Sequence, residues 1–290
     1  KSVILTGATG LVGSRFVELY ADQFDIHNLD LATGVDITDP SQVLSFISAH
    51  PSDTLIHLAA FTDTNRAFTE SGDKAGLCYR VNVLGTQHIA QACQTHGVHL
   101  VHISTDFVFD GTKTEPYIES DAPTPIEWYG ATKAMAEKTV QESGVAYTIA
   151  RLAYPYRAHF DIKPDLIKKI RAGLASGTLY PQFSDTTITP TFIDDIADGF
   201  AKIVEIKPSG IFHLTGSTSL SPYELARKVA VAYGFDPSLV KEGSLTEYQK
   251  TASRPFARHA AMSNAKATSA LGIHFATIDE GLSIIAGQKA

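Results

Sequence analysis

Residues 6–13 read Thr-Gly-Ala-Thr-Gly-Leu-Val-Gly, and they join an apolar run at residues 2–6 to a segment of helical periodicity that opens at Leu11. In this stretch Gly7, Gly10 and Gly13 recur every three residues. Because glycine has no Cβ, it permits a tight turn from strand to helix and close packing of the helix on the sheet. The stretch therefore predicts the first β-α turn of a Rossmann-type fold.

The alternation of strand and helix continues through the first half of the chain. Strand-like runs at residues 25–29, 54–60, 99–105 and 146–152 alternate with helical patterns at residues 11–21, 39–50, 79–96 and 128–143. Such alternation predicts a parallel sheet covered by helices on both faces. Beyond residue 152 the regular alternation of strand and helix ends, and short helices are expected near residues 164–174, 194–204 and 221–233.

The predicted fold class is therefore α/β, a Rossmann-type doubly wound parallel sheet with a smaller C-terminal α/β lobe. We expect residues 1–155 to form the dinucleotide-binding domain and residues 156–290 to form mainly the second lobe. Part of residues 186–215 is expected to return to the first domain.

The glycine loop also suits a phosphate ligand, because a helix N-terminus offers backbone amides and a partial positive charge. Asp30 ends the second strand-like run, about 20 residues after the loop, where an acid binds the adenosine ribose hydroxyls. An acid there repels a 2′-phosphate, so we expect NAD, with NADP possible if Arg15 accommodates that phosphate. Asp36 and Ile37 would lie near the adenine. The alternative is that Asp30 is a solvated turn residue.

Tyr129 and Lys133 lie four residues apart in a helical segment, so their side chains share a face. A neighbouring ammonium favours an ionised phenol, and we therefore expect Lys133 to lower the pKa of Tyr129 toward the range of a general acid or base. Thr105 ends a predicted parallel strand, at the edge where such sheets bind ligands. Its hydroxyl can orient the substrate oxygen with which Tyr129 exchanges a proton.

Composition excludes other classes of function. With 24 Lys and Arg against 31 Asp and Glu, the net charge of -7 disfavours binding to nucleic acid or to an anionic membrane. No targeting signal or apolar run of membrane-spanning length is seen, so a cytoplasmic location is expected. His99 and His102 would point to opposite faces of a strand, and no metal site is predicted.

Several motifs together resemble the extended short-chain dehydrogenases/reductases. They are the glycine loop, the Asp-Ile-Thr-Asp run at residues 36–39, His-Leu-Ala-Ala at residues 57–60, Val-Asn-Val-Leu-Gly-Thr at residues 81–86 and Tyr-Gly-Ala-Thr-Lys at residues 129–133. Within that group, the run at residues 102–111 is similar to the dTDP-4-dehydrorhamnose reductase family, as are Pro116, Tyr117, Glu119 and Asp121. Weaker similarity to that family follows at residues 185–191, 254–255 and 262–266.

The resemblance implies a catalytic triad of Thr105, Tyr129 and Lys133, and a substrate site that includes Thr105, Asp106, Tyr129 and Arg254. Tyr154 is implied to lie near the nicotinamide. The residues expected at the dinucleotide are Gly7, Thr9, Gly10, Leu11, Val12, Gly13, Asp30, Asp36, Ile37, Leu58, Ala59, Ala60, Tyr129, Lys133 and Tyr154.

The implied reaction is the NAD(P)H-dependent reduction of the 4-keto group of a deoxy sugar nucleotide by a homodimer. The run at residues 65–68 and the Leu-Ala-Tyr-Pro-Tyr-Arg run at residues 152–157 depart from the family pattern at the substrate side. Two alternatives therefore stay open. One is a sugar-nucleotide epimerase or dehydratase that recycles a tightly held NAD, and the other is a non-catalytic regulatory subunit that binds the dinucleotide.

Overall fold

The computed structural model describes residues 1–288 and consists of two compact units. The first unit comprises Lys1–Val108, Pro123–Arg151 and Ala197–Phe212. The second comprises Phe109–Ala122, Leu152–Ile196 and the chain from His213 onward. Each unit is described in its own frame below.

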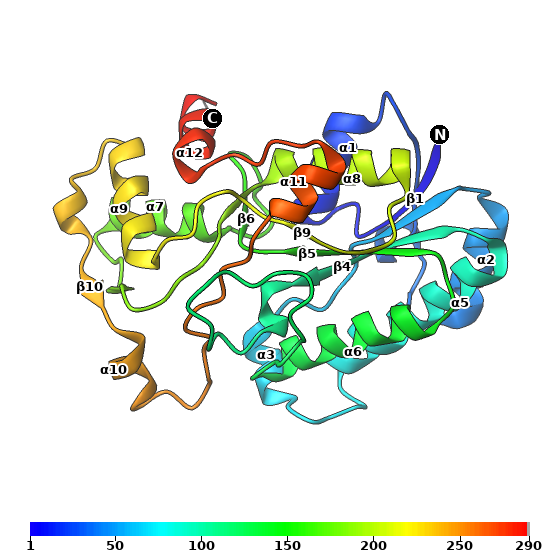
Figure 1. Cartoon of the computed structure of the whole chain (residues 1–290), viewed down its shortest axis with the longest axis horizontal. Helices are drawn as coiled ribbons and strands as arrows, with labels where there is room; N and C mark the ends of the chain where they lie inside the picture. The colour runs from blue at the N-terminus through cyan, green and yellow to red at the C-terminus, as the bar shows by residue number, and fades with distance from the viewer. Residues whose placement is uncertain (289–290) are drawn as a thin grey trace. The chain divides into compact units, whose positions relative to one another are not determined.

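The described part of the chain alternates strands and helices, as Figure 1 shows. The strands are β1 (Ser2–Thr6), β2 (Asp25–Asn28), β3 (Thr54–His57), β4 (His99–Thr105), β5 (Tyr147–Leu152), β6 (Pro155–Tyr156), β7 (Gln182–Phe183), β8 (Thr191–Phe192), β9 (Gly210–Leu214) and β10 (Glu242–Gly243). The α-helices are α1 (Leu11–Tyr20), α2 (Pro40–Ala49), α3 (Thr64–Thr69), α4 (Leu77–Tyr79), α5 (Thr86–His96), α6 (Trp128–Glu142), α7 (Leu166–Ser176), α8 (Ile193–Ile206), α9 (Pro222–Ala232), α10 (Leu245–Gln249), α11 (Ala265–Leu271) and α12 (Ile278–Gly287). Short helical turns are η1 (Leu31–Thr33), the π-helix η2 (Arg80–Gly85), η3 (Asp106–Val108) and η4 (Pro237–Leu239).

The first unit is built on a six-stranded sheet in the order β2-β1-β3-β4-β5-β9. The pairs β1/β2, β1/β3 and β3/β4 are parallel, with Val3 opposite both Ile26 and Thr54. Helices α2, α5 and α6 cover one face of the sheet, and α1 and α8 lie on the other (Figure 1). The predicted Rossmann-type α/β fold is confirmed.

Local sequence explains the boundaries of these helices. Asp39 caps α2 by accepting hydrogen bonds from the Ser41 and Gln42 amides, and Pro40 occupies the first helical position. Helix α5 ends at Gly97, whose φ of 66° suits glycine. The expected long helix at residues 79–96 is present as η2 running into α5, so a π-turn lies where the sequence pattern predicts a regular helix.

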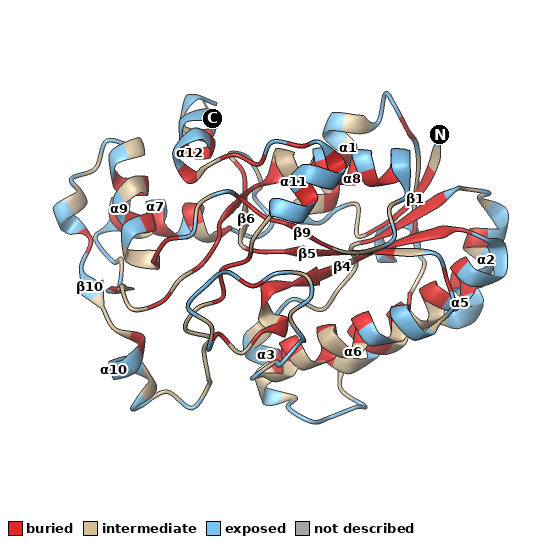
Figure 2. Ribbon diagram, viewed as in Figure 1, coloured by how far each residue is buried: buried red, intermediate tan, exposed pale blue. Residues whose placement is uncertain are grey.

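The core of the first unit is apolar and lies between the sheet and its helices. Figure 2 shows the strands β4 and β5 as buried and the outer sides of α2, α5 and α6 as exposed. One cluster joins the sheet to α2 and α5 through Leu55, Leu100, Val43 and Ile89. This packing fixes the carboxyl ends of β1 and β4, where Gly7 and Thr105 of the candidate site lie.

The second unit has its own core. Helices α7, α9 and α12 contribute Ile170, Leu225 and Leu282 to one buried cluster, beside the two-stranded sheets β6-β8 and β7-β10. Helix α9 begins with a capping box between Ser221 and Glu224. The predicted smaller C-terminal α/β lobe is therefore present as an independently packed unit.

The unit boundaries differ from those expected at residues 109–122 and at residues 152–155, which also belong to the second unit. Residues 109–122 were expected in the first domain, whereas they pack with the second unit. The reason is Tyr117, which is 2% exposed, forms a bridge with Met262 and accepts the Gly111 amide on its hydroxyl oxygen. Segment Ala197–Phe212 packs with the first unit and lies within the range 186–215 that was expected to return there. Among residues 1–288, no helix is long and apolar enough to cross a membrane.

Candidate active site

The glycine loop forms an open cradle between β1 and α1. Gly7 has a φ of +70°, and a Cβ there would lie 2.9 Å from the Ala59 amide nitrogen. A Cβ on Gly13 would lie 2.2 Å from the Gly7 carbonyl oxygen. Helix α1 is capped by Gly10, which has no side chain to accept a hydrogen bond from the amides of the first turn. Thr9 and Gly10 are exposed, and Leu11 and Val12 are partly buried. These features fit a pyrophosphate.

Replacing Gly13 by alanine is expected to weaken dinucleotide binding by at least about tenfold, because the new Cβ forces the Gly7 carbonyl out of the turn. Titration of the intrinsic fluorescence of a reduced dinucleotide measures the change. The matched control is Gly287→Ala on α12, where an added Cβ meets nothing within 4 Å. Wild-type affinity in the Gly13 variant would show that the loop does not bind the pyrophosphate.

Asp30 lies two residues after β2, and its two carboxylate oxygens differ in their hydrogen bonding. Oδ1 accepts the Ala32 amide at 2.7 Å, whereas Oδ2 is buried and has no hydrogen-bond partner within residues 1–288. An unsatisfied buried acceptor is unfavourable, so a ribose hydroxyl that donates to Oδ2 fits this position. Arg15 pairs with Glu18 at 2.9 Å.

The other residues expected near the adenine serve local structure. Asp36 accepts the amide and hydroxyl of Thr38 at 2.8 and 2.9 Å, which is the pattern of a turn. The Ile37 side chain is buried, and its Cδ1 is 2.8 Å from the point where a Cβ on Gly85 would be. The structure thus places Ile37 in the core beside η2.

A buried hydrogen-bond chain supports the segment of Leu58, Ala59 and Ala60 after β3. The Ala59 amide donates to Thr6 Oγ1 at 2.9 Å, and Thr6 Oγ1 lies 2.8 Å from His57 Nδ1. His57 Nε2 lies 3.2 Å from Thr86 Oγ1, whose proton goes to the Asn82 carbonyl at 2.7 Å. His57 must therefore donate from Nε2 and accept at Nδ1. Burial lowers its pKa to about 3, so it stays neutral.

Thr105 and Asp106 lie at the junction of β4 and η3. The Thr105 hydroxyl donates to Asp106 Oδ1 at 2.9 Å, and the Phe107 amide donates to Thr105 Oγ1 at 3.3 Å. Asp106 is 2% exposed, and burial raises the pKa of its carboxyl to about 7. The structure thus places the Asp106 carboxyl directly behind the Thr105 hydroxyl, where it controls the direction of that hydroxyl.

Asp106→Asn is expected to make the protein more stable at pH 8. It should also make the free energy of unfolding less dependent on pH between about pH 4 and pH 7. The pKa of Asp106 is raised from 3.8 to about 7, so in this window the folded protein holds a proton that the unfolded chain has lost, and stability falls as pH rises. The gain at pH 8 is on the order of a few kcal/mol, measured by urea denaturation from pH 4 to pH 8. The exposed Asp22→Asn is the control. A parallel pH dependence in the Asn variant and the wild type would contradict the prediction.

Tyr129 lies at the start of α6 in a small apolar cluster with Ala67 and Cys78. Its ring meets that of Phe107 edge-on, with centroids 5.3 Å apart. Burial and the nearby Asp106 raise the pKa of Tyr129, while a hydrogen bond with Thr105 acts in the opposite direction. The expected lowering of this pKa by Lys133 was wrong, because desolvation of the phenolate dominates. Tyr129 therefore holds its proton at neutral pH.

Lys133 lies one turn further along α6 and is 4% exposed. Its ammonium donates to the carbonyl oxygen of Ile103 in β4. Burial lowers the pKa of Lys133 to about 8, and the carboxylate of Glu137 limits this fall. Glu137 in turn holds Arg151 of β5 through bonds of 2.8 and 2.7 Å. Thr105, Tyr129 and Lys133 all come from this one region of the first unit, around β4 and α6.

Asn82 lies in the motif at residues 81–86 and supports the candidate site, a role that the motif alone does not indicate. Its side chain accepts the Phe61 amide at 2.8 Å and donates to Thr132 Oγ1 at 3.0 Å. Thr132 donates to the Tyr129 carbonyl at 2.8 Å. Asn82 thereby ties η2 to the helix that carries Tyr129 and Lys133.

Two predicted site residues belong to the second unit. Tyr154 has a φ of 43°, in the left-handed region that non-glycine residues seldom occupy, and it packs against the core of that unit. The Arg254 guanidinium carbon lies 5.0 Å from the centroid of the Phe256 ring. Among residues 1–288, no group of three or more His, Cys, Asp and Glu side chains is placed to hold a metal ion.

Comparisons with known proteins match nearly the whole chain. The sequence model of the family described as RmlD substrate binding domain matches residues 1–288. A dTDP-4-keto-6-deoxy-D-glucose reductase of Streptomyces niveus is 32% identical over 245 residues, which cover 82% of this chain and 81% of that protein. A probable low-salt glycan biosynthesis reductase, Agl14, of Haloferax volcanii is 28% identical over 300 residues, covering 97% of this chain and 96% of that one.

A solved structure agrees with these relatives. The dTDP-4-dehydrorhamnose reductase of Bacillus anthracis, in complex with NADP, superposes with a TM-score of 0.87 at 28% identity. The alignment covers 98% of each chain.

Proposed function

Because this chain belongs to the family described as RmlD substrate binding domain, we propose that it reduces the 4-keto group of a deoxy sugar nucleotide with a nicotinamide dinucleotide as hydride donor. The chain is an oxidoreductase of the extended short-chain dehydrogenase/reductase type. The observation that carries the proposal is the meeting of a protonated Tyr129 with Thr105 at the carboxyl end of β4, in the same unit as the glycine cradle.

The chain's own residues have separate roles in this proposal. The α1 amides and the glycine cradle bind the pyrophosphate, and Asp30 Oδ2 accepts a ribose hydroxyl. When bound, a reduced nicotinamide supplies a hydride to the carbonyl carbon. Tyr129 donates its phenolic proton to the carbonyl oxygen, and the C=O group becomes CH–OH.

Thr105 and Lys133 both assist this proton transfer, Thr105 through a hydrogen bond and Lys133 through its charge. When Asp106 is protonated, its hydroxyl can donate to Thr105 Oγ1, which leaves the Thr105 proton for the substrate oxygen. Lys133, held at the Ile103 carbonyl, supplies a positive charge that stabilises the Tyr129 phenolate after the transfer. Lys133 loses that charge as pH rises through about 8.

Substrate recognition is proposed for Arg254 of the second unit, and Tyr154 of the same unit is proposed to lie near the nicotinamide. A homodimer in the cytoplasm is a further part of the proposal and is supported by the family resemblance. Sedimentation equilibrium of the purified protein measures its mass, and a monomer at micromolar concentration would remove that part of the proposal.

The test of function mixes the purified protein with NADH or NADPH and a panel of 4-keto deoxy sugar nucleotides, and follows the absorbance of the reduced nicotinamide. We expect oxidation with at least one member of the panel, and a preference for NADH because the Asp30 carboxylate repels a 2′-phosphate. No oxidation despite dinucleotide binding would overturn the reductase proposal. A cofactor that co-purifies in stoichiometric amount would then point to an internally cycling epimerase or dehydratase.

A further inference from the structure

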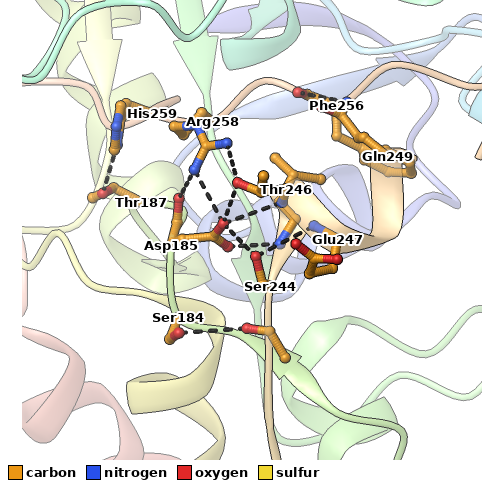
Figure 3. A network of polar contacts seen from close by, with 12 residues as sticks. Ser184, Asp185, Thr187, Ser244, Thr246, Glu247, Gln249, Phe256, Arg258 and His259 are labelled. Atoms are coloured by element: carbon orange, nitrogen blue, oxygen red, sulfur yellow. Dashed lines mark hydrogen bonds and ion pairs between the residues drawn. The ribbon is translucent and has the colours of Figure 1, made fainter.

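Asp185 in the second unit accepts hydrogen bonds from the first residues of the segment 244–258, which is distant in sequence. It lies two residues after β7, which pairs in parallel with β10, so the chain beyond each strand leaves at the same edge of this small sheet. Its carboxylate accepts the Leu245 amide at 2.6 Å, the Ser244 hydroxyl at 2.8 Å, and the Thr246 amide and hydroxyl at 3.1 and 3.0 Å (Figure 3). Asp185 thereby fixes the first turn of α10.

Arg258 completes the same network from the other end of the segment. Its Nη1 donates to the side chain and to the backbone carbonyl of Asp185, each at 3.1 Å, and its Nη2 donates to Thr246 Oγ1 at 2.7 Å (Figure 3). Burial alone would raise the pKa of Asp185, but the hydrogen bonds from Leu245, Ser244 and Thr246 outweigh it and lower the pKa. The carboxylate is therefore ionised at neutral pH and holds residues 244 and 258 together.

The segment between these two ends carries Arg254 on an aromatic support. The Arg254 guanidinium lies over the Phe256 ring at 5.0 Å, and Phe256 meets Tyr248 edge-on at 5.9 Å. Tyr248 packs on Phe183 of β7 at 5.5 Å. Gln249 Nε2 also donates to the Phe256 carbonyl at 3.4 Å. The guanidinium is thus pre-oriented by stacking on a ring that is itself anchored to the sheet.

We propose that Asp185 and Arg258 are positioning residues, which hold residues 244–258 so that Arg254 presents its guanidinium to the diphosphate of the sugar nucleotide. The substrate class rests on the proposed function. A planar guanidinium matches phosphate oxygens in a bidentate geometry, and a stacked one loses little further freedom when it binds. A five-residue helix and the loop after it would not stay ordered without ties at both ends.

The experiment measures binding of thymidine 5′-diphosphate to the whole protein by isothermal titration calorimetry, in the wild type, Asp185→Asn, Arg254→Ala and the double variant. Each single variant is expected to bind on the order of tenfold more weakly. The double variant is expected to bind no more weakly than Arg254→Ala alone, because Asp185 acts through Arg254. Affinity for the reduced dinucleotide should stay unchanged in all variants.

Two further variants complete the experiment, one as a substitute for Asp185→Asn and one as its control. Thr246→Val removes the hydroxyl that joins Asp185 to Arg258 without changing a charge, and it replaces Asp185→Asn if the latter does not fold. Asp236→Asn is the matched control, because Asp236 also caps a helical turn of this unit, at the Ser238 amide. Wild-type affinity in both Asp185→Asn and Thr246→Val, or additive losses in the double variant, would overturn the proposal.

Measurements of turnover distinguish a failure of this inference from a failure of the proposed function. If the wild type reduces a 4-keto sugar nucleotide, Asp185→Asn should raise its KM with kcat nearly unchanged, and an unchanged KM would refute the positioning role alone. If the wild type reduces none, the proposed function fails, while coupled losses of diphosphate binding still support the role of Asp185. If the wild type does not bind the diphosphate, the inference is refuted.

Discussion

Tyr129→Phe is expected to lower kcat by about 10²–10⁴-fold, the range that a positioned general acid contributes. The phenol is buried and its pKa is raised, so it is protonated at neutral pH, as the proposed proton donor must be. Phenylalanine keeps the ring and its edge-on contact with Phe107 but has no proton to give. Stopped-flow and steady-state oxidation of the reduced dinucleotide, with saturating 4-keto sugar nucleotide, measure the loss.

The control for this variant is an exposed tyrosine of the second unit. Tyr180 is 71% exposed in the second unit, and Tyr180→Phe should keep full turnover. Dinucleotide affinity should be nearly the same in both variants, because the glycine cradle is untouched. Tyr129→Phe with wild-type kcat would remove Tyr129 from the mechanism.

Glu137→Ala is expected to destabilise the protein by about 3–5 kcal/mol, because it leaves a buried guanidinium without its carboxylate. Arg151 and Glu137 are 0% and 2% exposed, and their bond joins β5 to the helix that carries Tyr129 and Lys133. The variant also removes the negative charge that raises the pKa of Lys133, so this pKa should fall below about 8. Urea denaturation at pH 7 measures the first effect, and the basic limb of the pH profile of kcat measures the second.

The same helix supplies a matched control. Lys138 and Glu142 form a surface pair 3.7 Å apart with side chains 72% and 67% exposed. Because an exposed pair of this spacing contributes only about 0.3–0.5 kcal/mol, Glu142→Ala should barely change the denaturation midpoint. Equal midpoints for Glu137→Ala and Glu142→Ala would mean that the buried pair does not hold α6 to β5.

Sequence patterns sufficed for the features that depend on neighbours in the chain. Glycines at three-residue spacing predict a strand-to-helix turn because the steric need for a missing Cβ is local, and both Gly7 and Gly13 meet that need. The spacing of Tyr129 and Lys133 places them on one face of a helix for the same reason. Alternating strand and helix patterns were enough to predict the parallel sheet.

The pKa values of the site were not predictable in this way. Proximity of Lys133 suggested a lowered pKa for Tyr129, yet burial raises it, and burial depends on how η3 and α6 pack. Asp106 is similar, because nothing in residues 102–111 shows that its carboxyl is buried against Thr105 with a pKa near 7.

The sequence by itself determined the Rossmann-type fold and its glycine turn, and it singled out the hydroxyl, phenol and ammonium groups expected to act, because these follow from backbone sterics and helical periodicity. Only the tertiary structure decided which groups meet across long separations. It joins His57 to Thr6 and Thr86, Glu137 to Arg151, and Asp185 to Arg258. Such pairs depend on packing between elements. Asp185 lies 59 positions from Ser244 and 73 positions from Arg258, and separations of this length leave no periodic signal in one sequence.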